Sequence, residues 1–130
     1  VFMPNEQELM ALTGMPSLGE AISAVSDLVN VMVVKCGSRG SVMIIHGRDR
    51  REIPALLNNS PVDCIGAGDS FNAGFISAYV HGTPLEDCQD MGNLTCAIST
   101  TAAGGTGAFA SVDSIKNAAS SFGKDIKLFK

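Results

Sequence analysis

The sequence has no tryptophan, one tyrosine and six phenylalanines, and only 17% of its 130 residues are charged. No apolar stretch reaches the ~18–20 residues that a helix needs to cross a bilayer, and no signal-peptide pattern opens the chain. Acidic residues outnumber basic ones by 13 to 9, and this charge of −4 argues against a nucleic-acid-binding surface. We therefore expect neither a membrane nor a nucleic acid as a partner.

The cysteines show no Cys-x-x-Cys spacing and no nearby histidines, which argues against a zinc site. There are four of them: Cys36, Cys64, Cys88 and Cys96. Isolated cysteines of this kind are typical of small buried thiols in a reducing compartment, so we expect a cytoplasmic protein.

Hydrophobic residues make up 45% of the chain and glycine is plentiful, which is typical of an α/β domain with an apolar core. The valine-rich run 31–35 predicts a strand buried on both faces. Residues 41–45 predict a second strand and 51–57 a weaker third one. The segment 31–57 is therefore interpreted as a β-meander attached to a parallel sheet.

Helices are predicted before and after this meander, at about 5–12, 17–29, 68–81, 84–101 and 111–121. The third of them begins after Gly66–Gly68, and its expected buried stripe is Phe71, Phe75, Ile76 and Tyr79. No linker or repeat interrupts the sequence, so a single unit is expected. The chain begins at Val1 within an apolar run, and we interpret this start as a cut inside a larger protein.

The strongest chemical signal is one string, Asp63-Cys64-Ile65-Gly66-Ala67-Gly68-Asp69-Ser70-Phe71-Asn72-Ala73-Gly74. Its glycines let the backbone approach a ligand closely, and the helix that follows leaves unpaired N–H groups at its positive end. Such a turn suits a phosphoryl group in transfer, and Asp69 could take a proton from an attacking hydroxyl. On these residues alone, an aspartate that merely favours its helix dipole stays an open alternative.

The same string resembles the second signature of the PfkB carbohydrate kinases, D-T-x-G-A-G-D with a phenylalanine two places later. Cys64 stands in place of the usual threonine. The resemblance spans roughly Pro4–Ile115 and implies a ribokinase-like α/β fold, of which this chain is the C-terminal, nucleotide-binding part. It also implies that the amides of Gly66–Gly68 form an anion hole and that Asp69 is the catalytic base.

The segment Asn5-Glu6-Gln7-Glu8 has two interpretations. By local physics it is a capping box at the start of a helix. It also resembles the N-x-x-E element of the same family, which implies that Asn5 and Glu8 hold Mg²⁺ through water near the phosphates. The two roles can coexist.

The segment Lys35-Cys36-Gly37-Ser38-Arg39-Gly40 follows a predicted strand, and its glycines are explained by a hairpin turn. The family places a similar segment against the triphosphate, which implies ATP contacts at Lys35, Gly37, Ser38 and Gly40. Arg39 could reach the phosphates or point to solvent.

Three weaker assignments also follow from the resemblance. Asn93 falls where the family contacts adenine, and Ala97 lies one turn further along the same helix. The loop 102–108 falls where the family holds a monovalent cation, together with Asp63 and the carbonyl of Ile65. K⁺ is therefore a third expected cofactor, beside ATP and Mg²⁺.

The resemblance implies an ATP-dependent phosphotransferase that acts on the hydroxymethyl group of a sugar or nucleoside. The acceptor pocket is not among these residues, so the chain alone is expected to be inactive and the acceptor is not specified. A homodimer of the full-length protein stays open. The alternative is a nucleotide-binding regulatory module that has lost catalysis, and the intact Asp69 and glycines argue against it.

Overall fold

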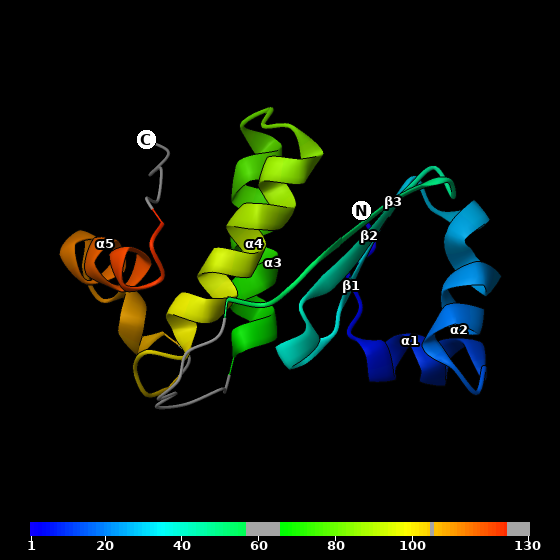
Figure 1. Ribbon diagram of the computed structural model, residues 1–130, viewed down its shortest axis with the longest axis horizontal. Coiled ribbons are helices and arrows are strands. Elements are labelled where there is room, and N and C mark those ends of the chain that lie inside the picture. The colour runs from blue at the N-terminus through cyan, green and yellow to red at the C-terminus, as the bar shows by residue number, and fades with distance from the viewer. Residues whose placement is uncertain (57–65, 105, 125–130) are drawn as a thin grey trace. The chain divides into compact units, whose positions relative to one another are not determined.

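The structure is a computed structural model that describes residues 1–56, 66–104 and 106–124. The chain forms two compact units, Val1–Ala55 and Leu56–Lys130 (Figure 1). The expectation that the chain forms a single part of a larger ribokinase-like domain stays a prediction. Consecutive segments build separate cores here, and such a division needs no linker that the sequence could reveal.

The N-terminal unit consists of two helices followed by a small sheet (Figure 1). Its elements are α1 (Glu6–Thr13), α2 (Leu18–Val25), the 3₁₀ turn η1 (Ser26–Leu28), β1 (Val31–Lys35), the 3₁₀ turn η2 (Gly37–Arg39), β2 (Ser41–Ile45) and β3 (Asp49–Ile53).

The sheet has the order β1-β2-β3 with both pairs antiparallel, so the predicted meander is confirmed. The chain before α1 runs parallel to β1, with bridges from Phe2 to Met32 and from Asn5 to Lys35. The Lys35 N–H donates to the Pro4 carbonyl at 3.0 Å. This pairing brings the start of α1 to the carboxyl end of β1.

Both helices pack against one face of this sheet. Leu9 of α1 and Ile22 of α2 join a core with Met32 and Val34 of β1 and Ile44 of β2. Val31 and Val33, which alternate with Met32 and Val34 along β1, are also buried, as expected for a strand buried on both faces. Burial of apolar side chains of this size stabilises the unit by about 1.5–3 kcal/mol each.

Two predicted boundaries in this unit are wrong. The third strand begins at Asp49, not at position 51, because backbone pairing with β2 outweighs the low strand propensity of a charged edge segment. The second helix ends at Val25 and continues only as a 3₁₀ turn, which leaves Leu28 78% exposed.

The C-terminal unit is helical in its described part and consists of α3 (Ala67–Val80), α4 (Leu85–Ser99), the 3₁₀ turn η3 (Gly107–Phe109) and α5 (Val112–Ser121). Ser111 is the N-cap of α5, at the start of the helix predicted for 111–121. Leu94 and Ile98 of α4 form a core with Ala108 and Ala119. None of the helices in the described ranges is long and apolar enough to cross a membrane.

The helices α3 and α4 approach each other closely at two glycines. A Cβ atom added to Gly74 would lie 2.1 Å from Thr95 Oγ1, and one added to Gly92 would lie 2.9 Å from the ring of Phe71. Both distances are too short for a real side chain, so the two helix backbones meet where only glycine fits.

The predicted buried stripe of α3 is half correct. Phe71 and Phe75 are buried, but Ile76 and Tyr79 are each 47% exposed. This helix is apolar on more than one face, so periodicity alone cannot identify the packed one. Gly74, which carries no side chain, completes the packed face instead of Ile76.

The close approach of α3 and α4 predicts that Gly74→Ala destabilises the protein. The added methyl group would meet Thr95 and the Met91 carbonyl, so the free energy of unfolding should fall by about 1–3 kcal/mol. Gly19→Ala is the matched control, because Gly19 is also helical but has open space around it. That change should raise stability by up to ~1 kcal/mol. Chemical denaturation of both variants measures the difference, and equal stabilities would contradict the packing described above.

Candidate active site

The N-terminus of α3 carries the glycine motif in a conformation that exposes backbone donors. Gly66 is the N-cap residue and adopts the left-handed region with φ 76°, which glycine tolerates well. The first helical bond runs from the Ser70 N–H to the Gly66 carbonyl at 2.9 Å. The amides of Ala67, Gly68 and Asp69 therefore precede the helical ladder, and no described side chain caps them. Two of them, Ala67 and Gly68, belong to the predicted anion hole. This end of α3 is suited to an anion.

Asp69 lies in the first turn of α3 and is exposed to solvent. The structure thus brings the predicted base and the predicted anion hole together in one helical turn. An exposed carboxylate next to unpaired amides can accept a proton from a group that an anion at those amides holds nearby.

Asn93 and Ala97, the expected adenine contacts, lie one turn apart on α4. Asn93 is half-buried, whereas Ala97 is only 5% exposed. The same helix contacts the first turn of α3, because the Thr95 hydroxyl donates to the Ser70 carbonyl at 2.6 Å. No sequence pattern pointed to Thr95, whose partner is 25 positions away.

In the N-terminal unit, Asn5 and Glu8 form a reciprocal capping box at the start of α1. Asn5 Oδ1 accepts the Glu8 N–H at 2.7 Å, and Glu8 Oε1 accepts the Asn5 N–H at 2.9 Å. The capping interpretation is confirmed. The magnesium role stays a prediction, and the donor set is compatible with it because both side chains are exposed and carry oxygen atoms.

The turn after β1 lies at the same end of the sheet as this capping box. Gly37 and Gly40 have positive φ angles of 59° and 93° and allow the chain to reverse into β2. Arg39 of this turn forms an ion pair with Glu6 of α1, a partner that neither of its two expected roles anticipated. Lys35, Gly37, Ser38 and Gly40 are thus brought next to the start of α1.

The thiol of Cys36, at the end of β1, is not an activated nucleophile. Burial raises the pKa of Cys36, and the negative charge of Glu6 raises it further, while Arg39 lowers it. The thiol therefore stays protonated at neutral pH. The chemistry of this turn must rest on its backbone groups and on charged side chains.

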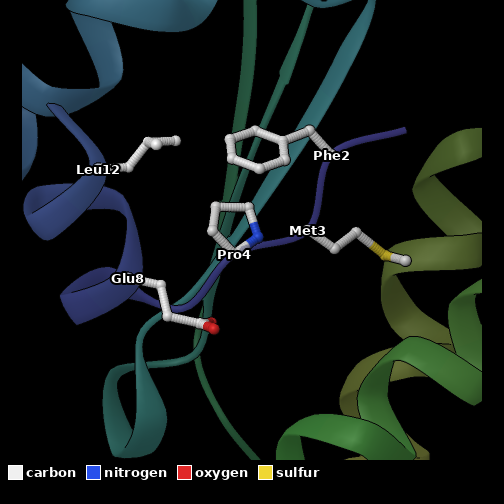
Figure 2. Close-up of a pocket in the computed structure, with 5 residues that line it drawn as sticks. All are labelled: Phe2, Met3, Pro4, Glu8 and Leu12. Carbon is white, nitrogen blue, oxygen red and sulfur yellow. The ribbon is translucent and has the colours of Figure 1, made fainter.

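A pocket of about 350 Å³ lies beside α1 and is lined by Phe2, Met3, Pro4, Glu8 and Leu12. Figure 2 shows the apolar side chains of Phe2, Pro4 and Leu12 with the Glu8 carboxylate near Pro4. An apolar lining with one carboxylate does not suit a phosphate group.

The expected cation site lies largely outside the described residues. Asp63 and Ile65 are not among them, and position 105 of the 102–108 loop is also omitted. Elsewhere in the described ranges, no three His, Cys, Asp or Glu side chains gather as a ligand set for a metal ion.

A family model for pfkB family carbohydrate kinases matches residues 1–111. The chain belongs to this family. It is 43% identical over 77 residues to a nucleoside kinase of Methanocaldococcus jannaschii, a match that covers 58% of this chain and 25% of that kinase.

Solved structures of pfkB-type kinases share the fold. The chain superposes on a probable sugar kinase of Rhizobium etli with a TM-score of 0.79 and 30% identity, over 93% of this chain and 35% of that one. It superposes on Arabidopsis thaliana ribokinase, solved with ribose and ATP, with a TM-score of 0.73 and 33% identity, over 78% and 35% of the two chains. The predicted ribokinase-like fold is confirmed, and the chain spans between a quarter and about a third of the length of these relatives.

The turn after β1 should not tolerate a side chain at Gly40. A Cβ atom there would lie 1.9 Å from the Ile53 carbonyl oxygen, and the backbone conformation itself favours glycine. Gly40→Ala should lower the free energy of unfolding by about 2–5 kcal/mol, from strain and overpacking together. Gly37→Ala also changes a glycine with positive φ but meets no atom within 4 Å, so it should cost only about 1–2 kcal/mol. Denaturation curves that place the two variants at the same stability would contradict this geometry.

Proposed function

We propose that this chain is the nucleotide-binding, catalytic part of an ATP-dependent kinase that phosphorylates a hydroxymethyl group of a sugar or nucleoside. The observation that carries the proposal is the uncapped N-terminus of α3 with Asp69 in its first turn. Family membership supports the kinase class. A ribokinase relative solved with ribose and ATP supports the kind of substrate pair.

In the proposed reaction, the amides of Gly66–Gly68 and the positive end of α3 stabilise the negative charge on the transferred phosphoryl group. Asp69 accepts the proton of the acceptor hydroxyl while the hydroxyl oxygen forms the new bond to the γ-phosphorus of ATP. The bond between this phosphorus and the bridging oxygen breaks, and ADP leaves. Positioning and charge stabilisation supply most of the rate in such transfers.

The proposed nucleotide contacts are those that the family resemblance implies. Lys35 and the backbone of Gly37, Ser38 and Gly40 bind phosphates, and α4 contributes adenine contacts through Asn93 and Ala97. These roles come from the family resemblance, and the exposed turn and half-buried Asn93 are compatible with them.

Asn5 and Glu8 would hold Mg²⁺ through water, and the ion would neutralise phosphate charge. The predicted K⁺ site at Asp63 and Ile65 stays a prediction. We further propose that the chain is inactive without the remainder of its protein, because no acceptor pocket is expected in it.

A second candidate is a nucleotide-binding module that has lost catalysis. Such a module would have no need of a carboxylate in the first turn of α3. The retention of Asp69 therefore favours the kinase.

The role of Asp69 is tested by Asp69→Asn in the full-length protein. Loss of the general base should lower kcat by about 10²–10⁴. ATP binding should persist, because the amides of Gly66–Gly68 are unchanged, and stability should fall by only about 0.3–1 kcal/mol. The measurements are kcat, the Kd for ATP and the melting temperature on one preparation.

The matched control for this test is Asp113→Asn. Asp113 also lies in the first turn of a helix, α5, and has no role in the proposed reaction. It should show the same small loss of stability with an unchanged kcat. A folded Asp69→Asn protein with wild-type kcat would reject the proposed chemistry.

The metal role of Glu8 can be separated from its cap by Glu8→Gln. The amide oxygen of glutamine can still accept the Asn5 N–H, so the capping box and most of the stability should remain. Loss of the negative charge should raise the Mg²⁺ concentration for half-maximal activity by about 10- to 100-fold.

Glu6→Gln is the control for the Glu8 variant, because it removes the same charge from the same helical turn. Because the Glu6 charge is already paired with Arg39, its removal should change the Mg²⁺ requirement by less than about threefold. Equal shifts in both variants would show that only the local field matters and would remove Glu8 from the metal site.

A further inference from the structure

The bond between Thr95 of α4 and the Ser70 carbonyl of α3 is the shortest that the Thr95 hydroxyl makes. Its oxygen lies 2.6 Å from the Ser70 carbonyl oxygen and 3.1 Å from the carbonyl oxygens of Met91 and Gly92 in its own helix. A hydroxyl has one proton to donate. A threonine within a helix usually gives this proton to its own preceding turn, whereas here the better acceptor belongs to the neighbouring helix.

The acceptor is placed directly after the proposed base. Ser70 follows Asp69 in the first turn of α3, so a bond to its carbonyl restrains the peptide between Ser70 and Phe71, one residue beyond the proposed base. Thr95 is only 8% exposed, so water competes little for this bond.

Two further contacts hold the same turn against α4. The ring of Phe71 lies over Gly92, and Gly74 lies against the Thr95 side chain, each within a distance that would not admit a Cβ atom. The beginning of α3 thus contacts α4 through the Thr95 hydroxyl, an aromatic ring and a bare backbone. A change at the hydroxyl alone leaves the contact of Phe71 with Gly92 in place, and Gly74 still faces the Met91 carbonyl.

We propose that Thr95 is a positioning residue that sets the orientation of the Asp69 turn through the Ser70 carbonyl. This inference rests on the proposed kinase function. Thr95 touches neither the nucleotide nor the acceptor in this proposal and acts only through the backbone of α3. It also joins the helix expected to contact adenine to the turn that carries the base.

The test compares Thr95→Ala with Thr95→Ser in the full-length protein. Both variants lose the methyl group, but only the serine retains the hydroxyl, so their difference reports the hydrogen bond. Thr95→Ala should lower kcat by about 10- to 100-fold, as expected when a catalytic group is misplaced. In Thr95→Ala the KM for ATP should change by less than about threefold, because the expected nucleotide contacts remain. Thr95→Ser should keep at least about half of the wild-type kcat, because it retains the hydroxyl.

Ser99→Ala is the matched control. Ser99 is a fully buried hydroxyl residue of the same helix, but it donates to the Cys96 carbonyl within α4 at 2.7 Å. Its removal should leave kcat within about twofold of wild type at a temperature where the melting curves show all variants folded. A comparable loss of kcat in Ser99→Ala would show that any weakening of α4 suffices, and would overturn the specific role of Thr95.

Amide hydrogen exchange provides a readout that does not depend on activity. The amides at positions 70–74 of α3 should exchange roughly 2- to 10-fold faster in Thr95→Ala than in Thr95→Ser. Amides at positions 77–80, at the other end of α3, should be unchanged. Equal exchange at 70–74 in the two variants would overturn the coupling, and faster exchange with an unchanged kcat would overturn the positioning role.

The same measurements separate this inference from the proposed function. If the wild-type protein transfers no phosphoryl group, the kinase proposal and the positioning role both fail, and hydrogen exchange alone decides whether the interhelical bond restrains the turn. If Thr95→Ala does not fold, Thr95→Cys, whose thiol is only a weak donor, takes its place with the same expected losses.

Discussion

The contact between α3 and α4 leaves no room for a carbon atom at Gly74, and the orientation of the glycine turn depends on this contact. The backbones approach closely here, because Thr95 and the Met91 carbonyl occupy the space that a Cβ atom on residue 74 would need. The turn at Gly66–Gly68 is thereby continuous with a closely packed pair of helices. Donors that are fixed before an anion arrives need no reorganisation, which is the condition under which they stabilise developing charge best.

The acidic composition of the chain agrees with this way of binding an anion. The formal charge is −4, so the overall field repels phosphate. Backbone amides and the positive end of a helix provide attraction without any basic residue. In the N-terminal unit, Arg39 already shares its charge with Glu6, which leaves the turn's backbone as the more direct source of donors.

At the carboxyl end of β1, the same atoms serve the fold and the proposed chemistry. Glu8 Oε1 closes the capping box of α1 through the Asn5 N–H. The parallel bridge between Asn5 and Lys35 sets the position of this box relative to the following turn. A substitution that removes either side chain therefore changes both stability and any metal role, and only substitutions that preserve the acceptor can separate the two.

The sequence alone determined those features that depend on residues within about four positions of one another. The cap at Asn5, the strand at Val31–Lys35 and the glycine turn at the start of α3 are all of this kind. Their physics is local, because a cap or a tight turn is satisfied by its own neighbours in the chain. The family motif added the expected roles of Asp69 and its glycines.

Only the tertiary structure decided the features that depend on distant residues. The Thr95 hydroxyl meets the Ser70 carbonyl across 25 positions, and Arg39 meets Glu6 across 33. Ile76 repeats at helical spacing and is nevertheless half exposed. Burial and long-range hydrogen bonds are set by which surfaces meet after folding, and an apolar period or a single hydroxyl in the sequence does not specify its partner.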